Sequence, residues 1–173
     1  MLGHFSLARA RRKARADRSI RPLLPDDIYW DATPSWSHDG KHIAFVSTRE
    51  DENTNVFVVD VDGSHLRRLT DNLAEDYDPE WSPDGTKIAF VARLVRGGSL
   101  LVHVMNADGS NLRTLDGDRS VDQTPSWSSD GQHIIFSSIH GRDFDLFMMD
   151  ADGKNVRQLT DNPVDDWGPV WRP

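Results

Sequence analysis

The chain has 173 residues, of which 37% are hydrophobic, 28% are charged and none is cysteine. Without cysteine it can form neither a disulfide nor a thiolate metal site. The formal net charge is −8, and because residues 1–25 carry +6, residues 26–173 carry −14. Such an acidic body would repel phosphates, and no stretch is long and apolar enough to span a bilayer. We therefore expect no nucleic-acid partner and no membrane insertion.

The first segment, residues 1–25, has seven basic side chains against the single acidic residue Asp17. A secretory signal would need an apolar run of about 7–15 residues after this basic start, and none follows. We predict a basic, disordered or weakly helical tail. The lack of an evident signal peptide favours a cytoplasmic location.

The clearest pattern in the remainder is the motif D-x-x-P-x-W, which occurs four times. Its tryptophans are separated by 45, 46 and 44 residues. A period near 45 is typical of repeat architectures whose unit is one four-stranded sheet. The four copies are Asp31–Trp36, Asp76–Trp81, Asp122–Trp127 and Asp166–Trp171.

The first repeat contains four short segments rich in β-forming residues. We expect strands at Pro34–Ser37, His42–Ser47, Asn55–Val61 and His65–Thr70. Asp-Gly pairs separate the first segment from the second and the third from the fourth. Asp-Gly between β-rich segments is a strong hairpin signal, because glycine accepts a positive φ and aspartate tolerates it.

The second and third repeats follow the same plan. Each second strand contains Ile-x-Phe, whose two side chains share one face of the sheet. We expect the motif tryptophans to pack in the same apolar layer between sheets. The expected strands are Pro79–Ser82, Lys87–Ala92, Leu100–Asn106 and Asn111–Leu115, followed by Pro125–Ser128, His133–Ser138, Phe144–Asp150 and Asn155–Thr160, and the tryptophans are Trp36, Trp81, Trp127 and Trp171.

Four antiparallel strands in each 45 residues predict an all-β fold, a partial β-propeller of three blades plus the first strand of a fourth. Residues 26–173 form this segment, with blades at about 31–75, 76–121 and 122–165 and the extra strand in 166–173. The first strand of each blade would lie nearest the axis and the fourth outermost. This geometry would place Asp31, Asp76, Asp122 and Asp166 at the mouth of the channel.

Three strings, W-S-H-D-G-K-H-I-A-F (36–45), W-S-P-D-G-T-K-I-A-F (81–90) and W-S-S-D-G-Q-H-I-I-F (127–136), resemble the TolB-type, WD-repeat-like propeller repeat. The ending D-x-D-G…R-x-L-T-D-N at 60–72 and 150–162 is similar to the same family. The resemblance implies either a protein that binds protein partners, as TolB does in the periplasmic Tol–Pal system, or the propeller domain of a prolyl-oligopeptidase-like hydrolase. It also implies a periplasmic location as the alternative.

The sequence contains no G-x-S-x-G nucleophile motif and no glycine loop for phosphate. We therefore expect a non-enzymatic interaction scaffold with no cofactor, whose protein partner contacts the loop-rich face over the channel. The alternative is a detached propeller domain of a prolyl-oligopeptidase-like hydrolase.

The four motif aspartates are the candidate site, since carboxylates held close together favour Ca²⁺ or a basic group of a partner. Their alternative role is structural, because aspartate before a strand often binds backbone N–H groups.

Three blades are fewer than the four to eight of a closed propeller. The end blades would then expose apolar faces to water. We expect oligomerisation, with a homodimer completing a six-blade ring as the favoured form.

Overall fold

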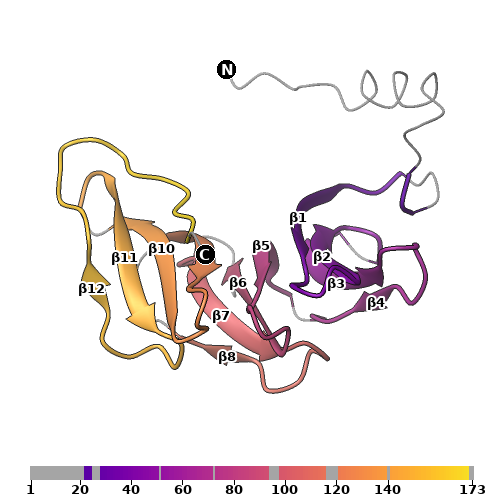
Figure 1. Ribbon diagram of the computed structural model, residues 1–173. Helices are drawn as coiled ribbons and strands as arrows, with labels where there is room; N and C mark the ends of the chain where they lie inside the picture. Colours follow the sequence, from indigo (N-terminus) through magenta and orange to yellow (C-terminus); the bar gives the residue numbers. More distant parts are fainter. Residues whose placement is uncertain are drawn as a thin grey trace.

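The computed structural model describes residues 22–24, 28–50, 52–71, 73–93, 98–115, 121–139 and 141–171. Their twelve strands form three four-stranded antiparallel sheets, each built from consecutive strands, so the expected all-β class is confirmed (Figure 1). We call these sheets blades 1, 2 and 3. Blade 1 contains β1 (Asp31–Trp36), β2 (His42–Ser47), β3 (Asn55–Asp60) and β4 (Arg67–Arg68); blade 2 contains β5 (Glu75–Trp81), β6 (Lys87–Arg93), β7 (Leu101–Asn106) and β8 (Arg113–Thr114); blade 3 contains β9 (Asp122–Trp127), β10 (His133–Ile139), β11 (Phe144–Asp150) and β12 (Arg157–Gln158).

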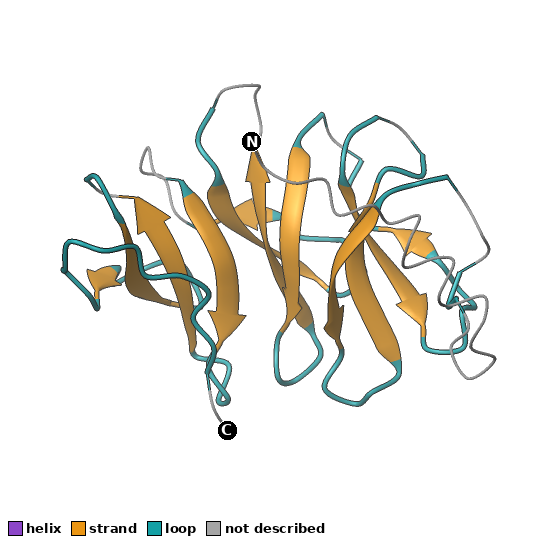
Figure 2. Ribbon diagram, turned by 90° about the horizontal axis from the view of Figure 1, so that it is seen from above, coloured by secondary structure: helices purple, strands orange, loops and turns teal. Residues whose placement is uncertain are grey.

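The three blades fan out around a common inner side. Figure 1 shows β1 and β5 on that side and the short strands β4, β8 and β12 at the periphery. Seen from above, the long strands run between loops gathered at two opposite ends of the fan (Figure 2). This is the arrangement of neighbouring propeller blades, with the first strand innermost.

The predicted Asp-Gly hairpins are present at all six repeated places. In blade 1 the Gly40 N–H donates to the Ser37 carbonyl, and the Gly63 N–H donates to the Asp60 carbonyl. Both glycines have positive φ, 69° and 89°. The Asp39 carboxylate accepts a hydrogen bond from the Ser37 hydroxyl at 2.7 Å, and this bond holds the pKa of Asp39 below its ordinary value. The seventh Asp-Gly pair, at 116–117, lies outside the described residues.

The inner strands are longer than predicted and the outer strands are shorter. β1, β5 and β9 begin at Asp31, Glu75 and Asp122, three or four residues before the motif prolines at which we expected them to start. The outer strands β4, β8 and β12 have two residues each. In the described part of the chain each is the edge strand of its sheet and pairs on one side only.

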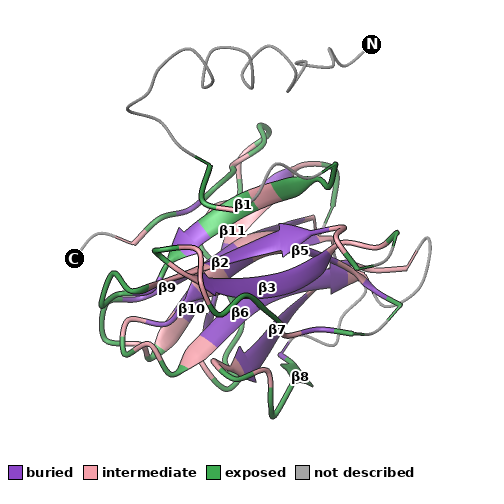
Figure 3. Ribbon diagram, turned by 90° about the vertical axis from the view of Figure 1, so that its right-hand side faces the viewer, coloured by how far each residue is buried: buried purple, intermediate pink, exposed green. Residues whose placement is uncertain are grey.

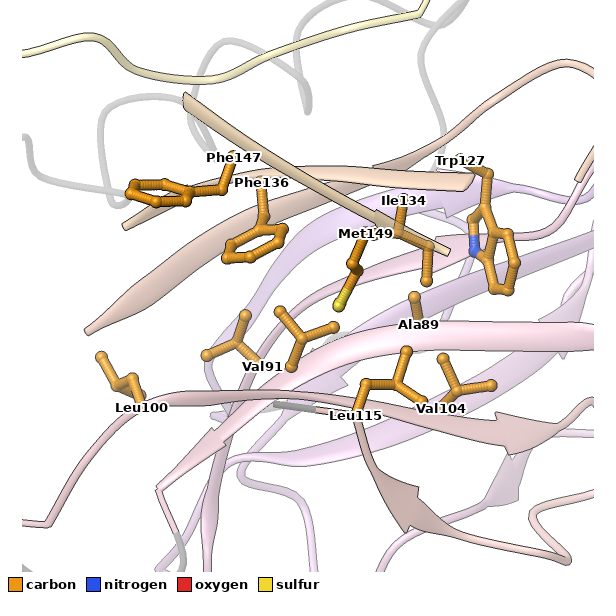
Figure 4. Close-up of a cluster of buried hydrophobic side chains, with 11 residues drawn as sticks. Ala89, Val91, Leu100, Val104, Leu115, Trp127, Ile134, Phe136, Phe147 and Met149 are labelled. Carbon is orange, nitrogen blue, oxygen red and sulfur yellow. The ribbon is translucent and has the colours of Figure 1, made fainter. Parts of the chain in front are cut away.

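The apolar core lies between successive blades. One cluster joins Trp127, Ile134 and Phe136 of blade 3 to Ala89 and Val104 of blade 2, as Figure 4 shows. A second cluster joins Trp81, Ile88, Phe90 and Met105 of blade 2 to Ala44, Val46, Val56 and Val58 of blade 1. The Ile-x-Phe pairs of blades 2 and 3 and two of the motif tryptophans therefore pack as expected.

Trp36 departs from that expectation. Its side chain is 60% exposed, whereas Trp81 is 7% and Trp127 is 6% exposed. Trp81 and Trp127 each pack on the blade before their own, and in the described part of the chain no blade precedes blade 1. Figure 3 shows the exposed residues of β1 beside the buried strands β2 and β3.

The described residues that follow blade 3 continue the repeat in part. Among the described residues, the expected strand Pro169–Trp171 is not part of a sheet. Its approach nevertheless follows the other repeats: the Asp166 N–H donates to the Phe144 carbonyl, as the Asp122 N–H does to the Leu100 carbonyl. The tail predicted for residues 1–25 lies outside the described residues except for 22–24.

Among the described residues there is no helix with the length and apolar character needed to cross a membrane.

Candidate ligand-binding site in the channel

Two of the predicted aspartates, Asp76 and Asp122, are fully buried. The Thr70 hydroxyl donates a hydrogen bond to Asp76 Oδ2 at 2.5 Å, and the Ser138 hydroxyl donates one to Asp122 Oδ1 at 2.6 Å. The Thr70 hydroxyl oxygen also accepts the Val56 N–H at 2.9 Å. Thr70 belongs to the end of blade 1 and Asp76 to blade 2, so this bond joins two blades.

The other two predicted aspartates lie nearer to solvent. Arg49 Nη2 contacts both carboxylate oxygens of Asp31 at 2.9 Å, and Asn162 Nδ2 donates to Asp166 Oδ2 at 2.7 Å. Over the described ranges, no three acidic or histidine side chains are grouped in a way that could hold a metal ion. Each aspartate is instead fixed by a local partner. Their binding of Ca²⁺ or of a partner's basic group stays a prediction.

The cavity on the inner side of the fan lies two residues further along each motif. It has a volume of about 420 Å³ and is lined by equivalent residues of all four repeats. From each repeat it takes the motif proline and the residue before it, and from three repeats also the residue after it. The lining residues are Thr33, Pro34, Asp78, Pro79, Glu80, Thr124, Pro125, Ser126, Gly168, Pro169 and Val170.

An unusual backbone conformation turns these residues toward the cavity. Thr33, Asp78 and Thr124 have φ values of 46°, 49° and 50°, although residues with a side chain seldom adopt positive φ. Pairing of the inner strand with its neighbour is irregular at the same point, between Tyr77 and Glu80 in blade 2. The irregularity breaks the strict alternation of the strand, as a β-bulge does, so residues on both sides of the proline face the cavity.

Blade 2 supplies the acidic residues of the cavity. Burial raises the pKa of Asp78 and of Glu80 above their ordinary values. In each case one hydrogen bond opposes the shift: the Thr124 N–H donates to Asp78, and the Ser35 hydroxyl donates to Glu80 Oε2 at 2.9 Å. The two carboxylates therefore lie in a partly desolvated place, where a charge without a counter-charge is costly.

The sequence-based reasoning missed both of these residues. Glu80 occupies the variable position of P-x-W, where the other repeats have Ser35, Ser126 and Val170. The available signal was the carboxylate itself, at a position where the other repeats have serine or valine.

The lining can bind but has few groups for catalysis. Its described polar side chains are two carboxylates and the hydroxyls of threonine and serine. Carboxylates with raised pKa can receive an ammonium or guanidinium group, whose charge compensates their desolvation. The geometry therefore favours a cationic ligand group.

Comparison with known proteins gives a family for most of the chain. The profile of a family described as TolB beta propeller domain matches residues 24–173. A comparison with curated proteins found no significant match.

Solved structures share the fold over most of the chain. A structure described as TolB from Agrobacterium tumefaciens has a TM-score of 0.70 and 24% identity, covering 86% of this chain and 57% of that one. TolB from Acinetobacter baumannii has a TM-score of 0.61 and 24% identity, covering 78% and 33%. A puromycin-hydrolyzing peptidase from Mycobacterium tuberculosis has a TM-score of 0.65 and 19% identity, covering 83% and 24%. The chain thus spans at most 57% of these structures, and the likeness shows the fold alone.

Proposed function

Because the chain belongs to the TolB β-propeller domain family, we propose that it is a non-enzymatic protein-interaction module. Its protein partner inserts a lysine or arginine side chain into the channel cavity. The observation that supports this proposal is the pair Asp78 and Glu80, whose pKa values are raised by burial within a cavity of about 420 Å³. A bound cation would relieve that unfavourable state.

Electrostatics beyond the cavity favour the same kind of partner. The acidic body, residues 26–173, carries −14 and would attract a basic surface over a distance comparable to the Debye length, about 8 Å at physiological salt. Attraction of this kind raises the association rate more than the affinity. Contacts inside the cavity would then provide the selectivity for a cationic side chain.

A pair of labelled peptides tests the proposal directly. The peptides Gly-Ser-Arg-Ser-Gly and Gly-Ser-Gln-Ser-Gly differ in one charge, and fluorescence anisotropy measures the affinity of each. We expect the arginine peptide to bind at least about 10-fold more tightly, which corresponds to about 1.4 kcal/mol. Asp78→Asn and Glu80→Gln should each remove most of that difference.

Glu52→Gln is the matched control, because Glu52 is an exposed carboxylate in the loop between β2 and β3. It changes the net charge equally but lies outside the lining of the cavity. If Glu52→Gln weakens binding as much as Glu80→Gln does, the attraction is general and the cavity is not the site. Melting temperatures should not fall in Asp78→Asn or Glu80→Gln, since each replacement removes a desolvated charge.

The second candidate function is the detached propeller domain of a prolyl-oligopeptidase-like hydrolase. Its support is the fold shared with the puromycin-hydrolyzing peptidase, over 83% of this chain. This function requires a catalytic chain, so co-purification with a serine hydrolase encoded in the same or an adjoining reading frame tests it. A stable complex that hydrolyses aminoacyl substrates would favour this function over the first.

A further inference from the structure

Two carboxylates of blade 2 line the channel cavity without a positive partner. Asp78 and Glu80 lie one on each side of Pro79, and the rest of the lining is uncharged proline, threonine, serine, glycine and valine. In the described part of the chain no basic side chain pairs with either carboxylate, and burial is the main cause of both raised pKa values. The cavity therefore holds two acidic groups, and the described residues compensate neither with a positive charge.

The neighbouring blades hold these two carboxylates apart. β5 contacts β1 of blade 1 and β9 of blade 3. The Ser35 hydroxyl of β1 donates to Glu80 Oε2 at 2.9 Å, and the Ser35 oxygen accepts the Trp81 N–H at 3.3 Å. The Thr124 N–H of β9 donates to Asp78. Glu80 is thus held toward blade 1 and Asp78 toward blade 3.

This opposite anchoring determines how many cationic groups the cavity can use. Along an extended strand, residues two apart share one face and lie on the order of 7 Å from each other. Because Asp78 and Glu80 are anchored to different blades, they do not turn toward one common group. A cation that pairs closely with one carboxylate leaves the other largely uncompensated, and a desolvated charge without a counter-charge is costly. A ligand with two cationic groups would relieve both.

We propose that the partner segment bound by this cavity is dibasic, with two lysine or arginine residues two positions apart in an extended stretch. The inference rests on the proposed function, because it specifies the chemistry of the cationic partner. In an extended segment such a pair shares one face and has the same backbone spacing as Asp78 and Glu80. The four motif prolines give the cavity an apolar wall, on which the methylene stems of both basic side chains can pack.

Peptides that differ only in charge test the number of cationic groups. The dibasic peptide is Gly-Ser-Gly-Arg-Ser-Arg-Gly-Ser-Gly, labelled and capped at both ends. Replacing its second arginine by glutamine gives a monobasic peptide, and replacing both gives an uncharged one. Fluorescence anisotropy with the full chain, at about 0.15 M salt, measures the three affinities. We expect the dibasic peptide to bind at least about 10-fold more tightly than the monobasic peptide.

A rearranged peptide separates spacing from total charge. Gly-Ser-Gly-Arg-Arg-Ser-Gly-Ser-Gly has the same composition and charge, but in an extended chain its adjacent arginines point to opposite faces. Attraction by the acidic body is equal for the two dibasic peptides. The rearranged peptide should therefore lose most of the gain and bind within about 3-fold of the monobasic peptide. Equal affinity of the two dibasic peptides would overturn the proposal.

Isosteric variants test which carboxylates receive the two charges. Asp78→Asn and Glu80→Gln each leave one carboxylate, so the second arginine should then improve binding by less than about 2-fold. Asparagine tolerates the positive φ of 49° at position 78, and each amide oxygen can still accept the bond from Thr124 or Ser35. Glu52→Gln, at an exposed site outside the lining, should keep the full gain.

The outcomes distinguish this inference from the proposed function. If the dibasic and monobasic peptides bind equally well and both bind more tightly than the uncharged peptide, the inference is wrong and the proposed function stands. If all the peptides bind equally, both are wrong. A gain from the second arginine that persists in Asp78→Asn and in Glu80→Gln would also overturn the inference.

Discussion

Replacing His103 by phenylalanine should remove a defined part of the acid sensitivity of this fold. His103 lies in β7, is 2% exposed and stacks on Phe90 with ring centroids 5.5 Å apart. Its Nδ1 lies 3.3 Å from the Thr114 hydroxyl, and its Nε2 has no hydrogen-bond partner among the described residues. Burial lowers the pKa of His103 from 6.5 to about 4. The folded protein therefore keeps this imidazole neutral.

Proton binding by the folded and unfolded chains determines how the free energy of unfolding changes with pH. Below pH 6.5 the unfolded chain protonates His103 while the folded chain does not, so the free energy of unfolding falls as the pH is lowered. The loss is complete once the pH is below about 4. The complete loss in the free energy of unfolding is about 3 kcal/mol. Between pH 7.5 and pH 5 the loss is about 2 kcal/mol.

Urea denaturation followed by tryptophan fluorescence, at pH 7.5 and pH 5, measures this effect in the native chain and in His103→Phe. Phenylalanine should fit, because Phe57 and Phe147 occupy the equivalent positions in blades 1 and 3. All other titrating groups are common to both proteins. Among them, Asp78 and Glu80 act with the opposite sign, because their raised pKa values favour the folded state on acidification. The free energy of unfolding changes between pH 7.5 and pH 5 in both proteins. The difference between these two changes is therefore the contribution of His103. Equal changes in the two proteins would refute the reasoning.

Three further predictions concern stability at neutral pH, measured by urea or thermal unfolding. Trp81→Ala should cost about 3–5 kcal/mol, because it leaves a cavity between blades 1 and 2; a cost below 1 kcal/mol would contradict the packing described. Gly153→Ala should destabilise more than Gly85→Ala. Both glycines have positive φ, but only at Gly153 would the added Cβ overlap a neighbouring carbonyl. Thr70→Val should cost about 1–3 kcal/mol, because it removes a hydroxyl from the buried Asp76 carboxylate; an unchanged midpoint would show that this bond is not needed.

The strands and their order could be predicted because their determinants are local. Asp-Gly turns and β-rich segments fix where a hairpin begins and ends, and the predicted ranges His42–Ser47 and Phe144–Asp150 match β2 and β11. The starts of the inner strands could not be predicted. A residue before proline prefers an extended conformation, and positive φ at Thr33, Asp78 and Thr124 departs from that preference.

The prediction of the site was limited for the same reason. If side chains alternated strictly along the strand, the motif aspartate would determine which face of the sheet every later residue occupies. The irregular pairing between Tyr77 and Glu80 breaks this alternation. The sequence therefore directed attention to Asp76, which is buried, and away from Glu80, which lines the cavity. The exposure of Trp36 likewise depends on which blade lies beside it, and no local pattern contains that information.

The hydrogen bond from Thr70 to Asp76 has a consequence for how the molecule comes apart. If the periphery of blade 1 detached, the Asp76 carboxylate of blade 2 would lose its hydroxyl donor. Part of the free-energy cost of detaching blade 1 therefore arises in blade 2. Neighbouring blades should unfold together rather than one at a time. The Thr70 side chain therefore couples the unfolding of blade 1 to that of blade 2.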